Sequence, residues 1–493
     1  MKINTAIIGA GIGGLGAAIR LAIRGYHVDV FERSSVPGGK LDQVTWNGYR
    51  WDTGPSLFTL PDQMETLYLM AGEEMKVSAR YHQLDVVTKY FYEDGKVLNA
   101  YGNPERFAKE VEEKTGEPAR RIARYLQKAK TMYELTRDVF IFNSFATPST
   151  FVSRKFLTAM IQAWKLDSLS TMHRSNARRF DSPHLVQLFD RYATYNGSNP
   201  YSAPGTLNMI SHLEHNLGAY FPEKGMYTLA RELYELAGRV GVQFHFDTPV
   251  EEVILEDRRV KGVRVNGENL PYSLVVSDVD IYYLYRDLLP GVKMPSKYFN
   301  QERSTSALIF HWAVEKEFPS LEIHNILFSE NYREEFVHLF SIKDIYEDPT
   351  VYIFISSKMV EGDAPRGGEN WFVMINVPEN IGQDWDAAID KIREKILSKI
   401  NRMLDTDIAR YIRHEFVNDP RTIEANTFSY RGSLYGNSSN SKLSAFSRHP
   451  NFRKDMNGLY FVGGSVHPGG GIPLCLASAH IVDHHIAKHY HHE

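Results

Sequence analysis

The feature that most constrains the fold is a glycine motif near the start of the chain, Gly9, Gly11 and Gly14. It follows a short apolar run, 5–8, that is typical of a buried parallel strand, and it precedes a stretch with helical periodicity, 13–24. The spacing allows a tight turn, close approach of backbone to a pyrophosphate, and close packing of the helix on the strand. We therefore predict a Rossmann-like unit that binds a dinucleotide.

An acidic residue stands where this interpretation requires one. Glu32 follows a second predicted strand, 28–31, about 20 residues after the glycines, where it can accept hydrogen bonds from a ribose hydroxyl. Such an acid argues against a phosphorylated ribose, although Arg33 lies beside it. The alternative is a glycine-rich turn that binds no ligand.

Two further turns lie within the next 25 residues. Gly38 and Gly39 precede Lys40, so that backbone N–H groups can face phosphate oxygens and the lysine adds a positive charge. Residues 48–55 read G-Y-R-W-D-T-G-P, and Ser56 follows. A plain Gly-Pro turn is the alternative for this second element.

A similar pattern recurs at the other end of the chain, in residues 458–479. A short apolar strand leads to Gly464 and Ser465, where small residues permit close approach of the backbone. Gly471, Ile472 and Pro473 then open a predicted helix whose first N–H groups can point at a ligand. Two halves of one cofactor site at opposite ends of a chain are unexpected by chance.

Taken together, V-P-G-G-K, D-T-G-P, D-T-P-V and G-G-S-V-H-P-G-G-G-I-P resemble the bacterial phytoene-desaturase-type carotenoid desaturases of the amine oxidase superfamily. The resemblance runs nearly end to end, and the most similar branch is the hydroxycarotenoid 3,4-desaturases. Two departures are Pro37, where the superfamily often has Arg, and the segment 474–477 after the last turn.

The resemblance implies an α/β fold with a Rossmann-like FAD-binding domain of the amine oxidase and glutathione reductase type, an inserted α+β substrate domain and a helical part. The FAD-binding domain is expected in 1–80, 225–285 and 420–493. The substrate domain is expected in 81–140 and 286–419, with a mixed or antiparallel sheet, and the helical part in 141–224.

The resemblance also implies FAD as the cofactor. The expected FAD-binding residues are Gly9, Gly11, Ile12, Gly13, Gly14, Glu32, Arg33, Gly38, Gly39, Lys40, Gly54, Pro55, Ser56, Val250, Gly464, Ser465, Gly471, Ile472 and Pro473.

The implied activity is desaturation of an acyclic carotenoid with the flavin as hydride acceptor, and the best match is 3,4-desaturation of a 1-hydroxycarotenoid. Electrons would pass on to oxygen or a quinone. We name no catalytic residue, because the sequence shows no triad, paired carboxylates or metal-ligand pattern. Alternatives are a phytoene or diapophytoene desaturase, a flavin oxidase of amines or porphyrinogens, and a non-enzymatic prenyl-binding protein resembling GDP-dissociation inhibitors.

The middle of the chain offers two candidate surfaces. The polar-aromatic stretch 187–204 predicts a surface loop, with a substrate-facing loop built on Arg191, Tyr195 and Asn196 as the alternative. An apolar series with basic neighbours, 151–164, suits a helix lying on a bilayer surface, or equally a helix packed on its own domain. The first option implies a cytoplasmic protein held on the inner face of the cell membrane.

Composition narrows the possible partners and cellular compartments of the protein. A formal net charge of −4 argues against a nucleic-acid partner, and a single cysteine suits a reducing compartment. No signal peptide and no membrane-spanning run are expected. We also predict β-hairpins in 85–100 and 260–276 and a helix in 385–404. The histidines at positions 484, 485, 489, 491 and 492 predict a solvated tail rather than a metal site.

Overall fold

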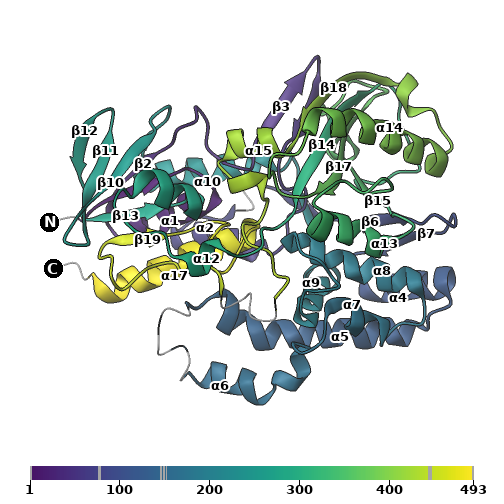
Figure 1. Cartoon of the computed structure of the whole chain (residues 1–493), viewed down its shortest axis with the longest axis horizontal. Helices are drawn as coiled ribbons and strands as arrows, with labels where there is room; N and C mark the ends of the chain where they lie inside the picture. The colour runs from purple at the N-terminus through teal and green to yellow at the C-terminus, as the bar shows by residue number, and fades with distance from the viewer. Residues whose placement is uncertain are drawn as a thin grey trace.

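A computed structural model describes residues 3–75, 79–144, 147, 150, 153–441 and 447–490. Its first layer is a five-stranded parallel sheet that unites distant parts of the chain (Figure 1). The strand order is β19 (Leu459–Phe461), β13 (Leu274–Ser277), β1 (Asn4–Ile8), β2 (His27–Phe31) and β9 (Gln243–His245). The predicted Rossmann-like α/β fold is confirmed, and the sheet is parallel throughout.

The two faces of this sheet are covered differently. Three helices, α1 (Ile12–Ile23), α10 (Tyr227–Arg239) and α17 (Ile472–His489), share one core with Ile7. A three-stranded antiparallel sheet shares another core with Ala6 and Ile8, on the opposite face. Successive strand residues point to opposite faces, so β1 is buried on both faces from Thr5 to Ile8, and its last three residues are all apolar.

The three-stranded sheet corrects one prediction. Its strands are β10 (Val250–Glu256), β11 (Arg259–Val265) and β12 (Glu268–Pro271). The hairpin therefore closes with β12, and the apolar strand β13 that follows pairs with β1 instead. A short run of buried β-branched residues fits an antiparallel hairpin and a parallel sheet equally well, so composition could not separate the two.

A second large sheet has seven strands and is mostly antiparallel. The order is β18 (Ile412–Asn418), β14 (Ser306–Val314), β17 (Glu369–Val377), β16 (Val351–Ile355), β15 (His324–Leu327), β6 (Val86–Phe91) and β7 (Val97–Tyr101). The pair of β15 and β6 is parallel, and it joins the early hairpin to the later strands. The predicted hairpin in 85–100 is thus confirmed as β6 and β7.

One face of this sheet is covered by α14 (Trp385–Leu404), whose bounds match the prediction. Its apolar residues Trp385, Ile392 and Ile396 recur at helical spacing and pack on Phe310 and Trp312 of β14. The alternate residues of β14 and its neighbours face away from α14, toward the parallel-sheet layer. This second face forms the floor of the site described below.

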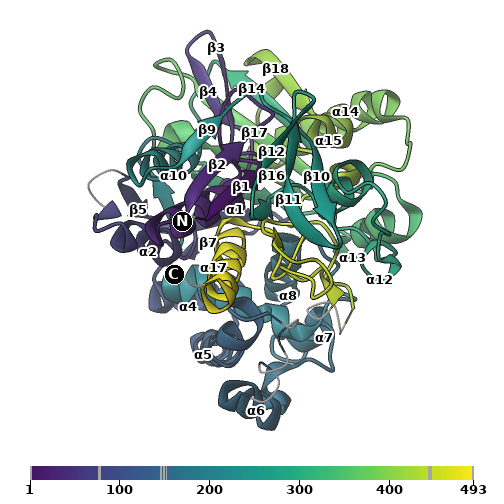
Figure 2. The same cartoon turned by 90° about the vertical axis from the view of Figure 1, so that its left-hand side faces the viewer.

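Helices lie below the seven-stranded sheet in Figure 1. They are α4 (Pro104–Thr115), α5 (Ala119–Thr136), α6 (Arg154–Ile161), α7 (Met172–Ala177), α8 (Pro183–Asp190) and α9 (Ile210–His212). Helix α6 lies farthest from both large sheets in Figures 1 and 2. The remaining elements are short: α2 (Asp62–Met70), α11 (Ile281–Tyr283), α12 (Ser296–Phe299), α13 (Tyr332–Val337), α15 (Pro420–Thr427), β3 (Gln43–Trp46), β4 (Tyr49–Asp52), β5 (Tyr81–Gln83) and β8 (Tyr220–Pro222).

The end of the described chain differs from the prediction. His484, His485 and His489 belong to α17, which buries Ile481, Val482 and Ile486 along the same stretch. The prediction of an irregular tail is wrong for these three histidines, although His484 and His489 are exposed to solvent as predicted, and positions 491 and 492 lie outside the described residues. Within the described ranges, no helix combines the length and the hydropathy needed to cross a bilayer.

Candidate functional site

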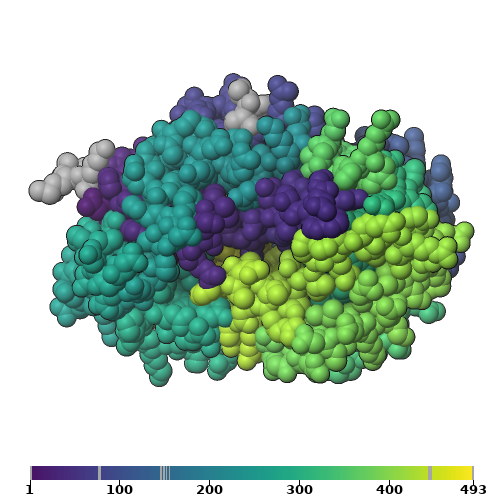
Figure 3. Space-filling view, turned by 90° about the horizontal axis from the view of Figure 1, so that it is seen from above, coloured from purple at the N-terminus to yellow at the C-terminus, as the bar shows by residue number. Residues whose placement is uncertain are grey.

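A cavity of about 880 Å³ lies between the parallel sheet and the seven-stranded sheet. Its lining combines the loops after β1, β2 and β13, the start of α17, and one face of the seven-stranded sheet. Figure 3 shows the surface hollowed beside the purple early segment, next to the yellow-green segment from late in the chain. The cavity therefore lies where the two layers meet.

The glycine motif forms one end of this cavity. Gly9 has a φ of 98°, and α1 begins immediately after Gly11 without a capping side chain. A Cβ at Gly13 would lie 2.7 Å from the amide nitrogen of Gly463, and one at Gly11 would lie 2.5 Å from a carboxylate oxygen of Asp278. Glycine is thus required here by close contacts as well as by the turn.

Asp278, at the end of β13, was not among the predicted site residues. Its carboxylate accepts a hydrogen bond from the amide of Gly14 at 2.9 Å. Burial raises the pKa of this carboxyl group to about 7. The sequence signal for it was its position directly after a predicted strand that returns to the dinucleotide fold, since such strand ends line ligand sites.

Glu32 and Arg33 follow β2 and both line the cavity. The Glu32 carboxylate accepts hydrogen bonds from the amides of Ala10 at 2.7 Å and Ser34 at 2.8 Å, which ties the acid to the glycine motif. The Arg33 guanidinium lies 3.7 Å from the ring centre of Phe428, just beyond α15. Arg33 therefore connects the first Rossmann unit to a segment almost 400 positions later.

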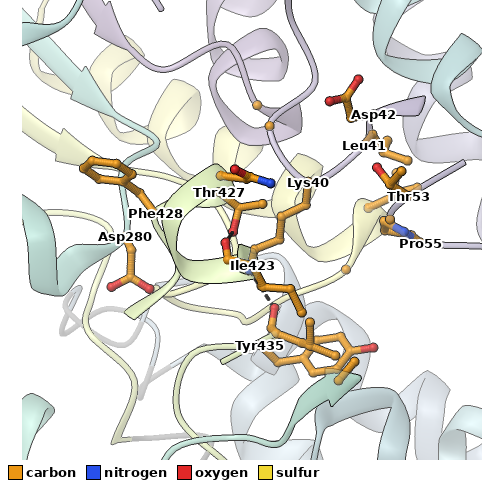
Figure 4. A pocket seen from close by; sticks show the side chains of 18 of the residues that line it. Lys40, Leu41, Asp42, Thr53, Pro55, Asp280, Ile423, Thr427, Phe428 and Tyr435 are labelled. Atoms are coloured by element: carbon orange, nitrogen blue, oxygen red, sulfur yellow. Dashed lines mark hydrogen bonds between the residues drawn. The ribbon is translucent and has the colours of Figure 1, made fainter. Parts of the chain in front are cut away.

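Lys40 extends into the cavity from the loop that follows Gly38 and Gly39. Its Nζ donates a hydrogen bond to the carbonyl of Leu434 at 2.7 Å, drawn as a dashed line in Figure 4. Burial lowers the pKa of the Lys40 amine. Figure 4 also places Asp280 on one side of this lysine and Pro55 on the other.

The start of α17 forms another wall of the cavity. Its N-cap is Gly471, with a φ of 110°, and no side chain caps the helix, so its first N–H groups remain available to a ligand. Ser465, in the turn after β19, ties that turn to the start of α11, because its Oγ accepts a hydrogen bond from the amide of Ile281 at 3.0 Å.

The structure brings most of the predicted FAD-binding residues to this one cavity. Those that line it are Gly9, Gly11, Glu32, Arg33, Gly39, Lys40, Gly54, Pro55, Ser56, Val250, Gly471, Ile472 and Pro473. Those outside the lining are Ile12, Gly13, Gly14, Gly38, Gly464 and Ser465. Members of the second group hold the walls in place, as the contacts of Gly14 and Ser465 illustrate.

The seven-stranded sheet provides the floor of the cavity on the face opposite α14. The cavity lining as a whole is more apolar than polar, and its floor combines the apolar residues Ala307, Ile309, Ile326, Phe372 and Met374 with the polar residues Thr88, His324, Tyr352, Asn376 and Asn418. Alternate residues of each strand contribute, as expected for one face of a pleated sheet. This part of the cavity suits a long apolar ligand lying beside the glycine loops.

A polar chain crosses this floor and reaches one of the flavin-type turns. The Oγ of Ser56 lies 2.6 Å from the Tyr352 hydroxyl, which lies 2.8 Å from Nδ1 of His324. Burial lowers the pKa of His324 to about 3, so its ring is neutral. Sequence reasoning missed both residues: β-strand alternation in 351–355 could have assigned Tyr352 to the cavity face, whereas His324 begins the short strand β15, which is buried along its whole length and shows no such alternation.

The stretch 187–204 is not the surface loop that we predicted. It continues from α8 into a 3₁₀-helix, η4 (Arg191–Asn196), and Arg191 is 8% exposed. Arg191 and Tyr195 line the cavity, and Asn196 does not. The prediction failed because Arg191 is buried by contacts with distant residues, Tyr90 and Glu214, which the local pattern does not show.

The residues present fit a bound FAD. Uncapped helix starts and glycine turns suit its pyrophosphate, and Glu32 suits a ribose hydroxyl. Within the part of the chain that the structure describes, no group of three or more histidine, cysteine or acidic side chains could hold a metal ion.

Comparison with known proteins agrees with this geometry. Residues 12–482 match the model of the family described as flavin containing amine oxidoreductase. The chain is 46% identical to 1-hydroxycarotenoid 3,4-desaturase of Flavobacterium sp. (strain P99-3), over 96% of this chain and 97% of the relative. It is 30% identical to 4,4'-diapolycopene oxygenase of Methylomonas sp., over 97% of this chain and 96% of the relative.

Solved structures share the fold at low identity. A wild-type putrescine oxidase with bound putrescine aligns with a TM-score of 0.62 at 15% identity, covering 99% of both chains. Cyclohexylamine oxidase from Brevibacterium oxydans IH-35A aligns with a TM-score of 0.60 at 14% identity, also over 99% of both chains. This chain is a flavoprotein oxidoreductase with FAD as its cofactor, and it belongs to the flavin containing amine oxidoreductase family.

Proposed function

We propose that this protein desaturates an acyclic carotenoid that carries a terminal tertiary hydroxyl, at its 3,4 position. The observation that carries the proposal is the cavity, in which the flavin-type turns open directly onto an apolar floor. The 46% identity to a 1-hydroxycarotenoid 3,4-desaturase supports this choice of substrate.

The contribution of the chain is to position the reactants and to exclude water. When bound, FAD supplies the hydride acceptor. The apolar floor, with Ile309 and Phe372 among its residues, would hold the polyene and keep the site dry. A cation spread over a polyene makes the neighbouring C–H acidic, so we assign no residue as a dedicated base. We further propose that electrons leave for oxygen or a quinone.

Product analysis with the purified flavoprotein tests this function. Acyclic carotenoids with and without a terminal hydroxyl are supplied in detergent micelles, and kcat/KM is measured for each. We expect the hydroxylated substrates to be preferred and to gain one double bond at the 3,4 position. Equal turnover of phytoene would indicate a general phytoene desaturase, and turnover of an amine without any polyene would overturn the assignment.

We also propose that the protein rests on the inner face of the cell membrane through α6 and the 3₁₀-turn η3 (Ala163–Leu166). Ile161 and Trp164 are each 78% exposed, Lys165 lies against the Trp164 ring, and Arg154 begins α6. Exposed apolar side chains flanked by basic residues are typical of segments that rest on anionic bilayers. Helix α6 is also set apart from the two sheets in Figures 1 and 2.

Flotation with anionic liposomes tests the membrane proposal. The double variant Ile161→Glu with Trp164→Glu should lose most of the bound fraction. Ile381→Glu is the matched control, because Ile381 is also exposed but lies near the start of α14. Equal flotation of the double variant and the wild type would mean that this segment is not the anchor.

A further inference from the structure

The apolar part of the cavity has one charged side chain at the end bordered by η4 and β6. Arg191 lines the cavity there, and the centre of its guanidinium lies 5.3–5.4 Å from the ring centres of Tyr90, Tyr192 and Tyr195. A buried arginine beside an apolar cavity is uncommon, because removing the charge from water is costly unless partners compensate.

The hydrogen bonds of this guanidinium are incomplete. Its Nη2 donates to the Tyr90 hydroxyl at 2.8 Å, whereas Nε has no partner among the described residues. Nε is itself enclosed, but the Arg191 side chain is 10% exposed and lines the cavity, so a ligand oxygen would be met by the other N–H groups of the guanidinium.

The charge of Arg191 is compensated by a carboxylate. Glu214 is fully buried, and its Oε1 lies 4.0 Å from the Arg191 guanidinium without a hydrogen bond of its own among the described residues. Its Oε2 accepts a hydrogen bond from the Tyr192 hydroxyl at 2.6 Å. The neighbouring His215 is neutral, because burial lowers its pKa to about 4. Burial raises the pKa of the Glu214 carboxyl group and the neighbouring Arg191 opposes that shift; with Glu214 ionised, the pair carries no net charge.

We infer that Arg191 is the hydrogen-bond donor that holds the terminal hydroxyl of the substrate, and that Glu214 makes this donor selective for an uncharged oxygen. A carboxylate at the same place would leave a net negative charge in a buried site, which is unfavourable. A chain end without oxygen would leave the donor unpaired. This inference rests on the proposed function, since it assumes that the cavity holds a polyene.

Arg191 and Tyr195 were both substrate candidates from the sequence. The geometry favours Arg191 as the donor, because its guanidinium lines the cavity and carries N–H groups beyond the one that Tyr90 accepts, and it leaves Tyr195 as a neighbour whose ring contacts the guanidinium. A purely structural role, in which Arg191 ties η4 to Tyr90 of β6, is the competing explanation.

Equilibrium binding to the FAD-loaded protein separates the two explanations. Three polyenes of equal length, ending in a tertiary hydroxyl, a hydrocarbon and a carboxylate, are titrated anaerobically while the flavin absorbance is followed. Wild type should bind the hydroxyl form about tenfold or more tightly than the other two. Arg191→Met with Glu214→Leu, which removes both charges, should lose that preference and keep its affinity for the hydrocarbon.

A second variant should gain affinity for one of the three polyenes. Glu214→Gln leaves Arg191 without its counter-charge, so affinity for the carboxylate form should rise about tenfold relative to wild type. A protein that was merely destabilised would not bind the carboxylate form more tightly than wild type. The control is Lys399→Met, which removes a cation that is also buried but that pairs with Asp348 and does not line the cavity. It should leave the order of the three ligands unchanged.

The possible failures are distinguishable. If wild type binds the hydroxyl and hydrocarbon forms equally, or if the double variant weakens both to the same extent, the inference is overturned and the desaturase proposal stands. If the folded, FAD-loaded protein binds none of the three polyenes, the proposed function itself fails.

Discussion

The carboxylate of Asp278 accepts a 2.9 Å hydrogen bond from the amide of Gly14, and in this way it covers the start of α1. A phosphate group in this turn would lie close to the same N–H groups. Because burial raises the pKa of Asp278 to about 7, its protonation state changes within the physiological range. If Asp278 stayed ionised, its carboxylate and the phosphate would compete for the same N–H groups at the start of α1.

The first prediction concerns FAD affinity. A bound pyrophosphate favours the protonated form of Asp278, so FAD should bind more weakly as pH rises from 6 to 9, by at most tenfold per pH unit. Titration of the apoprotein with FAD at several pH values measures this dependence. Asp278→Asn should bind FAD with little pH dependence, and an unchanged slope in this variant would exclude the carboxyl group as its source.

The same carboxyl group affects the stability of the apoprotein. Its pKa is higher in the folded than in the unfolded chain, so the folded state binds more protons between about pH 4 and 7 and loses stability as pH rises through that range. Asp278→Asn should therefore raise the Tm of the apoprotein at pH 8 and change it little at pH 4. An equal Tm change at both pH values would contradict this sign.

Substitution of two glycines by alanine should change the thermal stability in opposite directions. A Cβ at Gly54 would lie 1.8 Å from the carbonyl oxygen of Lys40, so Gly54→Ala should disrupt the turn and reduce both Tm and FAD content. Gly238 lies in α10 with no atom within 4 Å of an added Cβ. Gly238→Ala should stabilise the protein by about 0.5–1 kcal/mol, measured by thermal unfolding. If Gly54→Ala changed the Tm no differently from Gly238→Ala, the turn at Gly54 would tolerate a side chain.

Asp52 precedes the turn at Gly54 and accepts hydrogen bonds from backbone amides at the start of α10. Its carboxylate accepts hydrogen bonds from the amides of Met226 and Tyr227, each at 2.9 Å, and pairs with Arg50. Asp52→Ala should therefore reduce the free energy of unfolding by about 3–5 kcal/mol, measured by urea denaturation. The control Asp85→Ala breaks an exposed ion pair and should change stability by less than about 1 kcal/mol.

The single cysteine should be unreactive in the folded protein. Burial raises the pKa of the Cys475 thiol to about 12, and only the thiolate reacts quickly with alkylating agents. Iodoacetamide at pH 8 should leave the native protein unmodified for hours and should label the urea-unfolded protein within minutes. Mass spectrometry reads out the modified fraction, and rapid labelling of the native protein would show that the thiol is accessible.

Local patterns predicted the parts of the structure that depend on local physics. Helical periodicity and a following break defined α14, and glycine spacing with its flanking strand and helix defined the first Rossmann unit. The position of β13 was mispredicted, because four buried residues carry no information about their pairing partner. Arg191 and His324 depend on tertiary contacts that bury them, so their roles at the cavity became visible only in the folded arrangement.

The parallel sheet joins β1 to β13 and β13 to β19, and this order has a consequence in time. About 450 residues separate Ile8 from Leu459, so a ribosome adding roughly 5–20 residues per second needs roughly 20–90 s to deliver the last strand after the first. During that interval the sheet lacks β19, so the edge of β13 that later pairs with β19 has no partner strand. Loading of the cofactor is therefore expected only after β19 has left the ribosome, and chaperones that shield exposed strand edges would act on this protein before then.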